Sequence, residues 1–155
     1  MIIASFEYSI NFIDPLDVFV GYDDTSSCCE DFGWLFLPKP YHEMTTELIG
    51  SAGDWSEYGD ALDYSMCMFG NDEKKIVKEL ENYVFDTTTK VEDEGEAAIF
   101  RLIGPNGSNV YLHLYNYHNG YYAHGFQFSV GPDGFHQNPT KALYDKATTI
   151  TSGSL

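Results

Sequence analysis

Hydrophobic and polar residues alternate along the first part of the chain. An aromatic or aliphatic side chain occupies every second position from residue 6 to residue 12, at Phe6, Tyr8, Ile10 and Phe12. A period of two is the pattern of a strand with one buried face. Residues 1–13 are therefore predicted to form one strand. Asp14-Pro15 ends it, because proline donates no backbone hydrogen bond and restricts the residue before it.

Further apolar runs predict strands at 18–20, 34–37 and 97–103. The last of these is followed by Pro105-Asn106-Gly107, a strong turn signal. Residues 42–63 contain three glycines and show no regular period. The segment from residue 131 onward is rich in Gly, Pro, Asn and Thr and is predicted to be mostly loop, with residues 148–155 frayed.

A helix is predicted to begin near Asn71 or Asp72, with Asn71 as its N-cap. Acidic residues follow in its first turn, where they complement the helix dipole. The apolar positions Ile76, Val77, Leu80 and Tyr83 then form one stripe along the helix.

Asn119-Gly120 is the preferred pair for a two-residue hairpin turn. That turn predicts antiparallel pairing of Tyr115 with His124, His113 with Phe126 and Tyr111 with Phe128. Because side chains alternate between the faces of a sheet, one face of this hairpin is predicted to carry almost only aromatic residues and two histidines.

Three interpretations of this face remain open. In the first, the face packs in the hydrophobic core. In the second, it binds a partner, since Tyr-rich surfaces are common at binding hot spots. The third is a metal site using His113 and His124. Two ligands are too few for such a site, so Cys28, Cys29 or a carboxylate would have to complete it.

Length and composition bound the fold class. A chain of 155 residues is the size of one domain, and 43% hydrophobic residues suffice for a core. The 16% aromatic content favours strands. We therefore expect a single domain spanning 1–155, of the α+β class, with an antiparallel sheet and one main helix packed on a face.

Charge is distributed unevenly. The formal net charge is −16. Residues 1–73 contain fifteen acidic residues and one basic residue, a net charge of −14, whereas residues 74–155 contain nine and seven, a net charge of −2. Such a surface repels nucleic acid and attracts basic proteins. We expect a basic protein partner, namely a toxin or an enzyme that acts on nucleic acid, and no direct nucleic-acid binding.

The candidate partner-binding residues lie in two acidic segments. One combines carboxylates with two large aromatic residues, which would anchor a contact while the acids engage Arg or Lys. The candidates are Asp54, Trp55, Glu57, Tyr58, Asp60, Asp63, Asp23 and Asp24.

Nothing in the sequence predicts catalysis or a cofactor. The chain lacks a phosphate loop, a dinucleotide fingerprint, a nucleophile elbow and an HExxH motif. Cys28 and Cys29 are adjacent, which suits neither a disulfide nor the usual zinc spacing, and their neighbours are acidic. We predict no catalytic residue and no bound metal. With three cysteines, no leader-like start and no long apolar run, a cytoplasmic protein without a membrane span is expected.

Residues 117–126, which read Tyr-His-Asn-Gly-Tyr-Tyr-Ala-His-Gly-Phe, follow an upstream Cys28-Cys29-Glu30. This combination resembles a pattern in small uncharacterised bacterial and phage proteins and covers about a third of the chain. The resemblance implies a compact β-rich fold and a bacterial or phage origin. It implies no activity and no site residue.

These observations favour a non-enzymatic acidic protein that neutralises a protein partner by occluding its basic surface. An immunity protein against a toxin, or a phage inhibitor of a host defence enzyme, would fit. Two alternatives stay open: a small metal-dependent enzyme using His113 and His124, and a phage accessory or structural protein.

Overall fold

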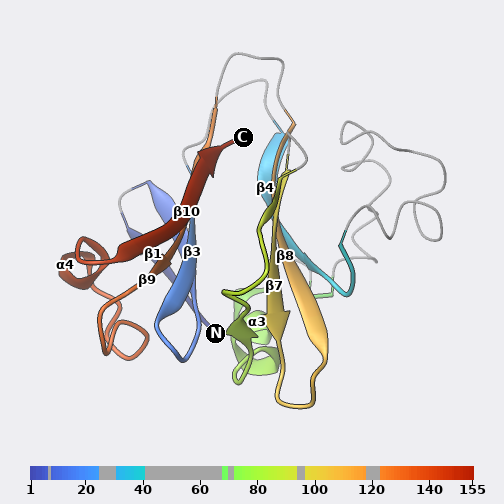
Figure 1. Cartoon of the computed structure of the whole chain (residues 1–155), viewed down its shortest axis with the longest axis horizontal. Coiled ribbons are helices and arrows are strands. Elements are labelled where there is room, and N and C mark those ends of the chain that lie inside the picture. The colour runs from blue at the N-terminus through green and yellow to red at the C-terminus, as the bar shows by residue number, and fades with distance from the viewer. Residues whose placement is uncertain (7, 25–30, 41–67, 70–71, 94–96, 118–122) are drawn as a thin grey trace.

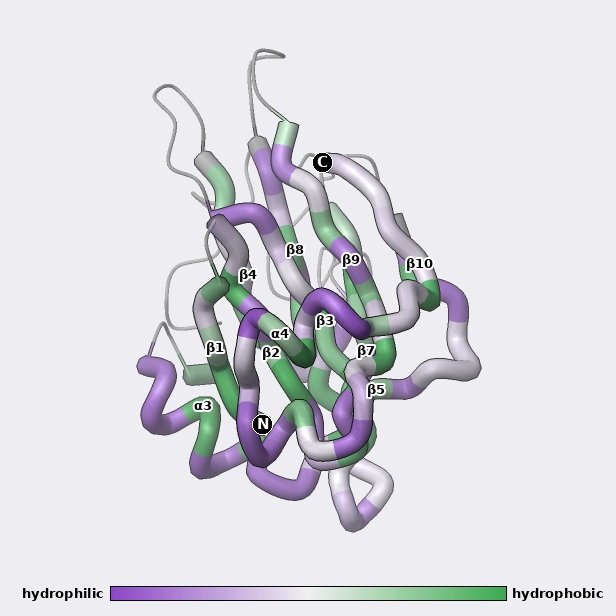
Figure 2. Tube along the Cα trace, turned by 90° about the vertical axis from the view of Figure 1, so that its left-hand side faces the viewer, coloured by the Kyte–Doolittle hydropathy of each residue, from purple (hydrophilic) through white to green (hydrophobic). Residues whose placement is uncertain are grey.

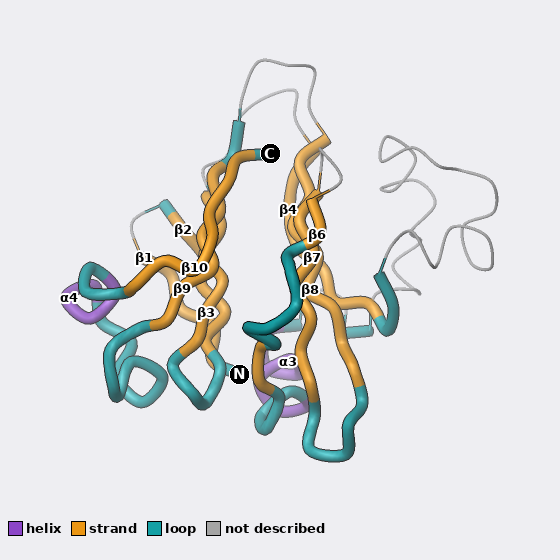
Figure 3. Tube along the Cα trace, in the orientation of Figure 1, coloured by secondary structure: helices purple, strands orange, loops and turns teal. Residues whose placement is uncertain are grey.

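The described part of the chain forms two antiparallel sheets that face each other across one interior (Figures 1 and 3). The computed structural model describes residues 1–6, 8–24, 31–40, 68–69, 72–93, 97–117 and 123–155. Sheet A has the order β1 (Ile2–Phe6), β2 (Ser9–Ile13), β3 (Val18–Asp23), β9 (Gly125–Val130) and β10 (Thr148–Ser154). Sheet B has the order β4 (Asp31–Leu37), β8 (Asn109–Tyr117), β7 (Ala97–Ile103) and β5 (Val84–Phe85), and β6 (Glu92–Asp93) also pairs with β7.

The predicted antiparallel, β-rich character is confirmed, but the arrangement contains more β structure than one sheet covered by one helix. Sheet A is covered by sheet B, while α3 (Glu73–Glu79) contributes Ile76 and Leu80 at one end of the interior. The N-cap is Asp72 rather than the predicted Asn71, and the Asp72 carboxylate accepts a hydrogen bond from the Lys75 amide at 3.2 Å. Val77, predicted to share the buried stripe, is exposed. Among the described residues, no helix is long and apolar enough to cross a membrane.

Residues 1–13 form two strands, so the prediction of one continuous strand is wrong. The chain reverses after Phe6, which pairs with Ser9 across the β1–β2 turn. Ile10 and Phe12 point into the interior, whereas Phe6 packs in a second cluster on the outer face of sheet A. Alternation continues through this turn without Gly, Pro or Asn, so the pattern did not distinguish one long strand from a tight hairpin.

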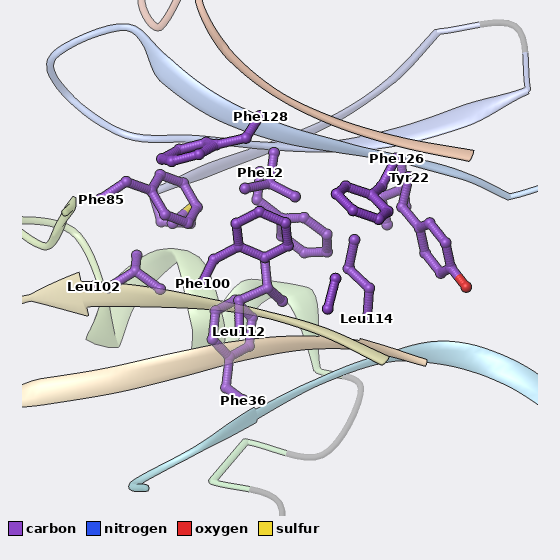
Figure 4. Packing of buried hydrophobic residues seen from close by; sticks show 14 of the residues in the cluster. Phe12, Tyr22, Phe36, Phe85, Phe100, Leu102, Leu112, Leu114, Phe126 and Phe128 are labelled. Carbon is purple, nitrogen blue, oxygen red and sulfur yellow. The ribbon is translucent and has the colours of Figure 1, made fainter. Parts of the chain in front are cut away.

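The predicted pairing of residues 111–117 with 124–128 is also wrong. β8 pairs with β4 and β7 in sheet B, whereas β9 pairs with β3 and β10 in sheet A. Leu112 and Leu114 therefore meet Phe126 and Phe128 across the interior (Figure 4). In a hairpin these leucines and phenylalanines would lie on opposite faces of one sheet. Burying both sets in a common interior outweighs pairing the two segments directly in one hairpin.

Aromatic rings fill the interior from both sheets. Phe100 of sheet B lies with its ring centroid 5.8 Å from that of Phe126 and 5.4 Å from that of Phe128, both in edge-to-face geometry. Phe12 of sheet A contacts Trp34 of sheet B in the same way at 4.9 Å. Edge-to-face packing is a favourable arrangement for ring quadrupoles, so these contacts help to fix how the sheets face each other.

The C-terminal segment is part of the fold, and the predicted fraying of residues 148–155 is wrong. β10 pairs with β9 along its length. Beyond it, Leu155 is buried and exchanges two backbone hydrogen bonds with His124, at 2.8 and 2.9 Å. The Asn116 side chain of sheet B donates a further bond to the Leu155 carbonyl oxygen at 2.8 Å. Gly153 lets β10 approach closely, because the Phe126 ring occupies the place of a Cβ at this position.

Asp14 joins the two sheets at the β2–β3 turn. Its buried carboxylate accepts hydrogen bonds from the backbone amides of Leu16 at 2.8 Å and Val18 at 2.9 Å in its own turn, and from Phe85 of β5 at 2.8 Å. Burial raises the pKa of Asp14, and the three amide bonds oppose that shift. The turn of sheet A is therefore fastened to sheet B by one side chain.

We expect Asp14→Ala to lower the free energy of unfolding by about 3 kcal/mol, because it leaves buried amides without an acceptor. Asp14→Asn keeps an oxygen for Leu16 and Val18 but turns an amide group toward Phe85, so its cost is intermediate. Urea unfolding followed by circular dichroism measures both. Asp133→Ala, at an exposed carboxylate, serves as the control, and equal stability of all three variants would contradict this role.

A second carboxylate organises the segment after β5. Asp86 accepts hydrogen bonds from the backbone amide and hydroxyl of Thr88, at 2.9 and 2.7 Å, and from the hydroxyl of Thr89. Its backbone amide bonds the Arg101 carbonyl oxygen at 2.9 Å. Hydrogen bonds from Thr89 and Thr88 lower the pKa of Asp86 to about 2, from an ordinary value of 3.8.

The lowered pKa predicts acid sensitivity. A carboxylate with a depressed folded-state pKa contributes stability above its unfolded value, and this contribution is lost as pH falls through the folded value. The unfolding free energy should therefore decline between about pH 4 and pH 2. In Asp86→Asn this decline should be shallower than in the wild type and in an Asp133→Asn control. Identical pH profiles of wild type and Asp86→Asn would refute the assignment.

Candidate functional site

A hollow of about 370 Å³ opens on the outer face of sheet A, the face that carries α4 (Lys141–Tyr144). We call it the outer hollow. Its floor includes Gly21 of β3 and Gly125 of β9, two positions without side chains. It is lined by Phe6, Tyr8, Ser9, Gly21, Tyr22, Asp23, Gly125, Phe126, Gln127, Lys141, Tyr144 and Ser152.

Aromatic rings form one side of the outer hollow. The rings of Phe6 and Tyr144 lie 5.3 Å apart and belong to the cluster that packs α4 onto sheet A around Phe19 and Phe135. Tyr8, in the β1–β2 turn, is 72% exposed. An exposed tyrosine next to packed rings is a typical anchor for a protein partner.

Polar side chains complete the lining. Asp23 and Ser9 are paired across β3 and β2, and Gln127 and Ser152 are paired across β9 and β10. Lys141 forms an ion pair with Asp145, and its Nζ lies 5.0 Å from the centroid of the Tyr144 ring. The outer hollow thus offers hydrogen-bond acceptors, a carboxylate and rings whose faces attract cations.

Asn11 supports the floor from β2. It is fully buried, and its Nδ2 donates to the Ser9 hydroxyl at 3.1 Å and to the Ala4 carbonyl oxygen at 3.4 Å. Its Oδ1 would lie only 2.5 Å from a Cβ on Gly21. A side chain at residue 21 would therefore displace Asn11, so glycine is needed here for close approach rather than for a turn.

Two predicted partner-binding residues lie at the outer hollow or beside it. Asp23 is in its lining, and the neighbouring Asp24 is exposed. The Asp24 amide donates to the Tyr8 carbonyl oxygen at 2.6 Å, which holds the end of β3 against the β1–β2 turn. The other predicted residues, Asp54, Trp55, Glu57, Tyr58, Asp60 and Asp63, lie outside the described residues, as do Cys28 and Cys29.

The two candidate histidines do not share a face. His124 is buried, stacks on Phe32 with the ring centroids 4.0 Å apart, and has Nδ1 3.2 Å from the Asp23 carbonyl oxygen. His113 is also buried but alternates with Leu112 and Leu114, so it lies on the face of sheet B turned away from sheet A. In the described part of the chain, no group of three or more His, Cys, Asp or Glu residues could hold a metal ion.

Sequence reasoning missed Phe6, Tyr8, Tyr144 and Lys141 as parts of the site. The alternating pattern predicts Tyr8 in the middle of a strand, on the same face as Phe12. Residues 141–144 are more than a hundred positions from β1 and β2 in the sequence. The only available signal was the helix-like start at Thr140, whose side chain accepts a hydrogen bond from the Leu143 amide.

Gly21 and Gly125, the two glycines of the floor, differ in the space around them and give a matched pair of predictions. Gly21→Ala should lower the unfolding free energy by about 1–3 kcal/mol, because the new Cβ would displace the buried Asn11 side chain. Gly125→Ala should be close to neutral, because among the described residues its Cβ would meet only the Gly153 carbonyl oxygen, at 3.8 Å. Thermal unfolding of both variants tests this, and a neutral Gly21→Ala would contradict the described packing.

Comparisons with protein-family models, curated proteins and solved structures find no match to this chain. The geometry of the outer hollow and the charge of the chain are therefore the basis for a functional proposal.

Proposed function

We propose that this protein is a non-enzymatic binding protein that neutralises a basic protein partner by covering its basic surface. The observation that carries the proposal is the grouping of exposed Tyr8 with Asp23, which both line the outer hollow, and with the adjacent exposed Asp24. A ring that anchors and carboxylates that attract Lys or Arg are the two components such a contact needs.

Several acidic residues of the N-terminal half have structural roles. Fewer carboxylates are therefore candidates for contact with a partner. Asp14 accepts three backbone amides, and Asp72 caps α3. Asp17, at φ 66°, accepts bonds from the amides of Gly134 at 3.2 Å and His136 at 2.8 Å. Among the described acids up to residue 24, Asp23 lines the outer hollow and the exposed Asp24 follows it in the chain.

The proposed contact proceeds in two stages. The net charge of −16 steers a basic partner toward the protein at long range. A lysine or arginine side chain of the partner then enters the outer hollow, with its charge near Asp23 and its alkyl stem against Phe6 and Tyr8. The protein occludes the partner's basic cleft and itself changes no covalent bond.

An immunity protein or a phage inhibitor of a host defence enzyme, acting in the cytoplasm, fits this mechanism. A partner that normally holds nucleic acid would present the required basic cleft, because phosphate binding depends on Lys and Arg. The contacts predicted for residues 54–63, which lie outside the described residues, remain part of the proposal.

The test is a comparison of charge-matched variants in affinity purification from the native host. We expect the wild type to retain a stoichiometric partner with a basic surface. Asp23→Asn/Asp24→Asn and Tyr8→Ala should each weaken binding at least tenfold. Glu73→Gln/Glu79→Gln, which removes the same charge at exposed positions of α3, should weaken it less than threefold.

Salt and activity measurements complete the test. The association rate should fall steeply as ionic strength rises, since electrostatic steering is screened beyond a Debye length of about 8 Å at physiological salt. The partner's activity should be lost at one equivalent of this protein. The absence of a basic partner, or equal losses in the Tyr8, Asp23 and Asp24 variants and the α3 variant, would exclude the proposal.

A further inference from the structure

β10 forms one margin of sheet A and has only β9 as a neighbour among the described strands. Six of its seven residues are exposed, and Figure 2 shows it in pale colours at the border of the sheet. We propose that this edge binds an extended segment of a partner protein, which adds a strand to sheet A beside β10. The proposal goes beyond the contact at the outer hollow and does not depend on it.

The backbone of β10 defines which groups are available to an added strand. Leu155 and His124 exchange both of their backbone hydrogen bonds, so they form a hydrogen-bonded pair. In an antiparallel ladder such pairs alternate with pairs whose amide and carbonyl groups point away from each other. By the observed register, Gly153 and Thr151 bond to β9, whereas Ser154 and Ser152 direct their amide and carbonyl groups outward.

This edge lacks the usual protection against strand addition. Proteins commonly shield exposed edges with charged side chains, proline or a bulge. Residues 147–155 contain no charged side chain and no proline, in a chain of net charge −16. The register shift at Ile150, between Thr149 and Thr151, disrupts only the first part of β10. Residues 151–154 remain a regular edge.

A second hollow adjoins β10 on the side that faces sheet B. It has a volume of about 530 Å³ and is lined by residues 87–91 together with Phe128, Ile150 and Thr151. In strand addition, main-chain bonds supply affinity and pockets for alternate side chains supply specificity. Alternate side chains of the added strand would enter this hollow, where Val91, Phe128 and Ile150 favour small or medium apolar residues.

A second copy of this chain fits the edge less well than a different protein. Two copies would each bring a net charge of −16 and repel each other. The residues that β10 itself turns toward the interior are Thr151 and Gly153, which pair with Phe128 and Phe126. Side chains this small would leave much of the hollow empty. We therefore assign the edge to an uncharged or basic extended segment of a partner.

The probe is a displayed library of random eight-residue peptides, selected on the wild-type protein. We expect enriched peptides to alternate apolar and variable positions and to protect the amides of Ser152 and Ser154 from hydrogen exchange. Ser152→Pro and Ser154→Pro should each weaken binding at least tenfold, because each removes an outward amide but no bond to β9. The matched Ser152→Ala and Ser154→Ala variants should stay within twofold of wild type.

A semisynthetic protein with N-methylated Ser154 serves as a second variant if a proline variant unfolds, and it should show the same loss. Three results would overturn the proposal: no peptide enriches, enriched peptides bind the proline and N-methyl variants as tightly as wild type, or the wild type sediments as a dimer that Ser154→Pro dissociates. The last result would assign the edge to self-association. Asp23→Asn/Asp24→Asn should leave peptide binding unchanged, which separates this test from that of the outer hollow.

Discussion

The packing of aromatic and aliphatic side chains between the two sheets is the constraint on which the other features depend. Phe12, Phe126 and Phe128 of sheet A meet Phe36 and Phe100 of sheet B, and each buried ring contributes about 2 kcal/mol from its removal from water. Because side chains alternate along a strand, the choice of which residues face inward also decides which face outward. The composition of the outer surfaces follows from this choice.

Sheet A illustrates that consequence. With Val18, Val20 and Tyr22 in the interior, Phe19 and Gly21 must face outward. Phe19 then requires a cover, which Phe135 and Tyr144 supply from the segment after β9. Asn11 fills the place of a side chain at Gly21, and the outer hollow opens over Gly21 beside that cover. The candidate site is thus a gap between a covered and an uncovered part of the same sheet face.

Acidic residues divide between structural and surface roles according to their position in turns. Asp14 and Asp17 both lie in the β2–β3 turn, where backbone amides from distant segments converge on their carboxylates. Asp24 follows the end of β3 and is exposed. One carboxylate can accept hydrogen bonds from several backbone amides. An acidic residue therefore stabilises a turn that packs against other segments. Net charge alone therefore overstates the acidic surface offered to a partner.

The sequence by itself determined several local features. It predicted the strands at 18–20, 34–37 and 97–103, the start of α3 to within a residue or two, and the turn around Gly107, whose φ is +74°. These depend on period, capping and turn chemistry among near neighbours, which a linear pattern records. It also marked Asp23 and Asp24 as candidates for partner binding, because a run of acidic residues without basic ones is visible locally.

Only the tertiary structure decided which strands pair. The alternating patterns of β8 and β9 are equally compatible with a hairpin and with membership of two sheets, and the choice depended on Phe100, Leu112, Phe126 and Phe128 sharing one interior. The same holds for β10, whose Thr and Ser residues show little apolar pattern but complete the ladder beside β9. Pairing across a long stretch of chain is settled by total burial and by satisfied backbone groups, and neither quantity is encoded in any short window of sequence.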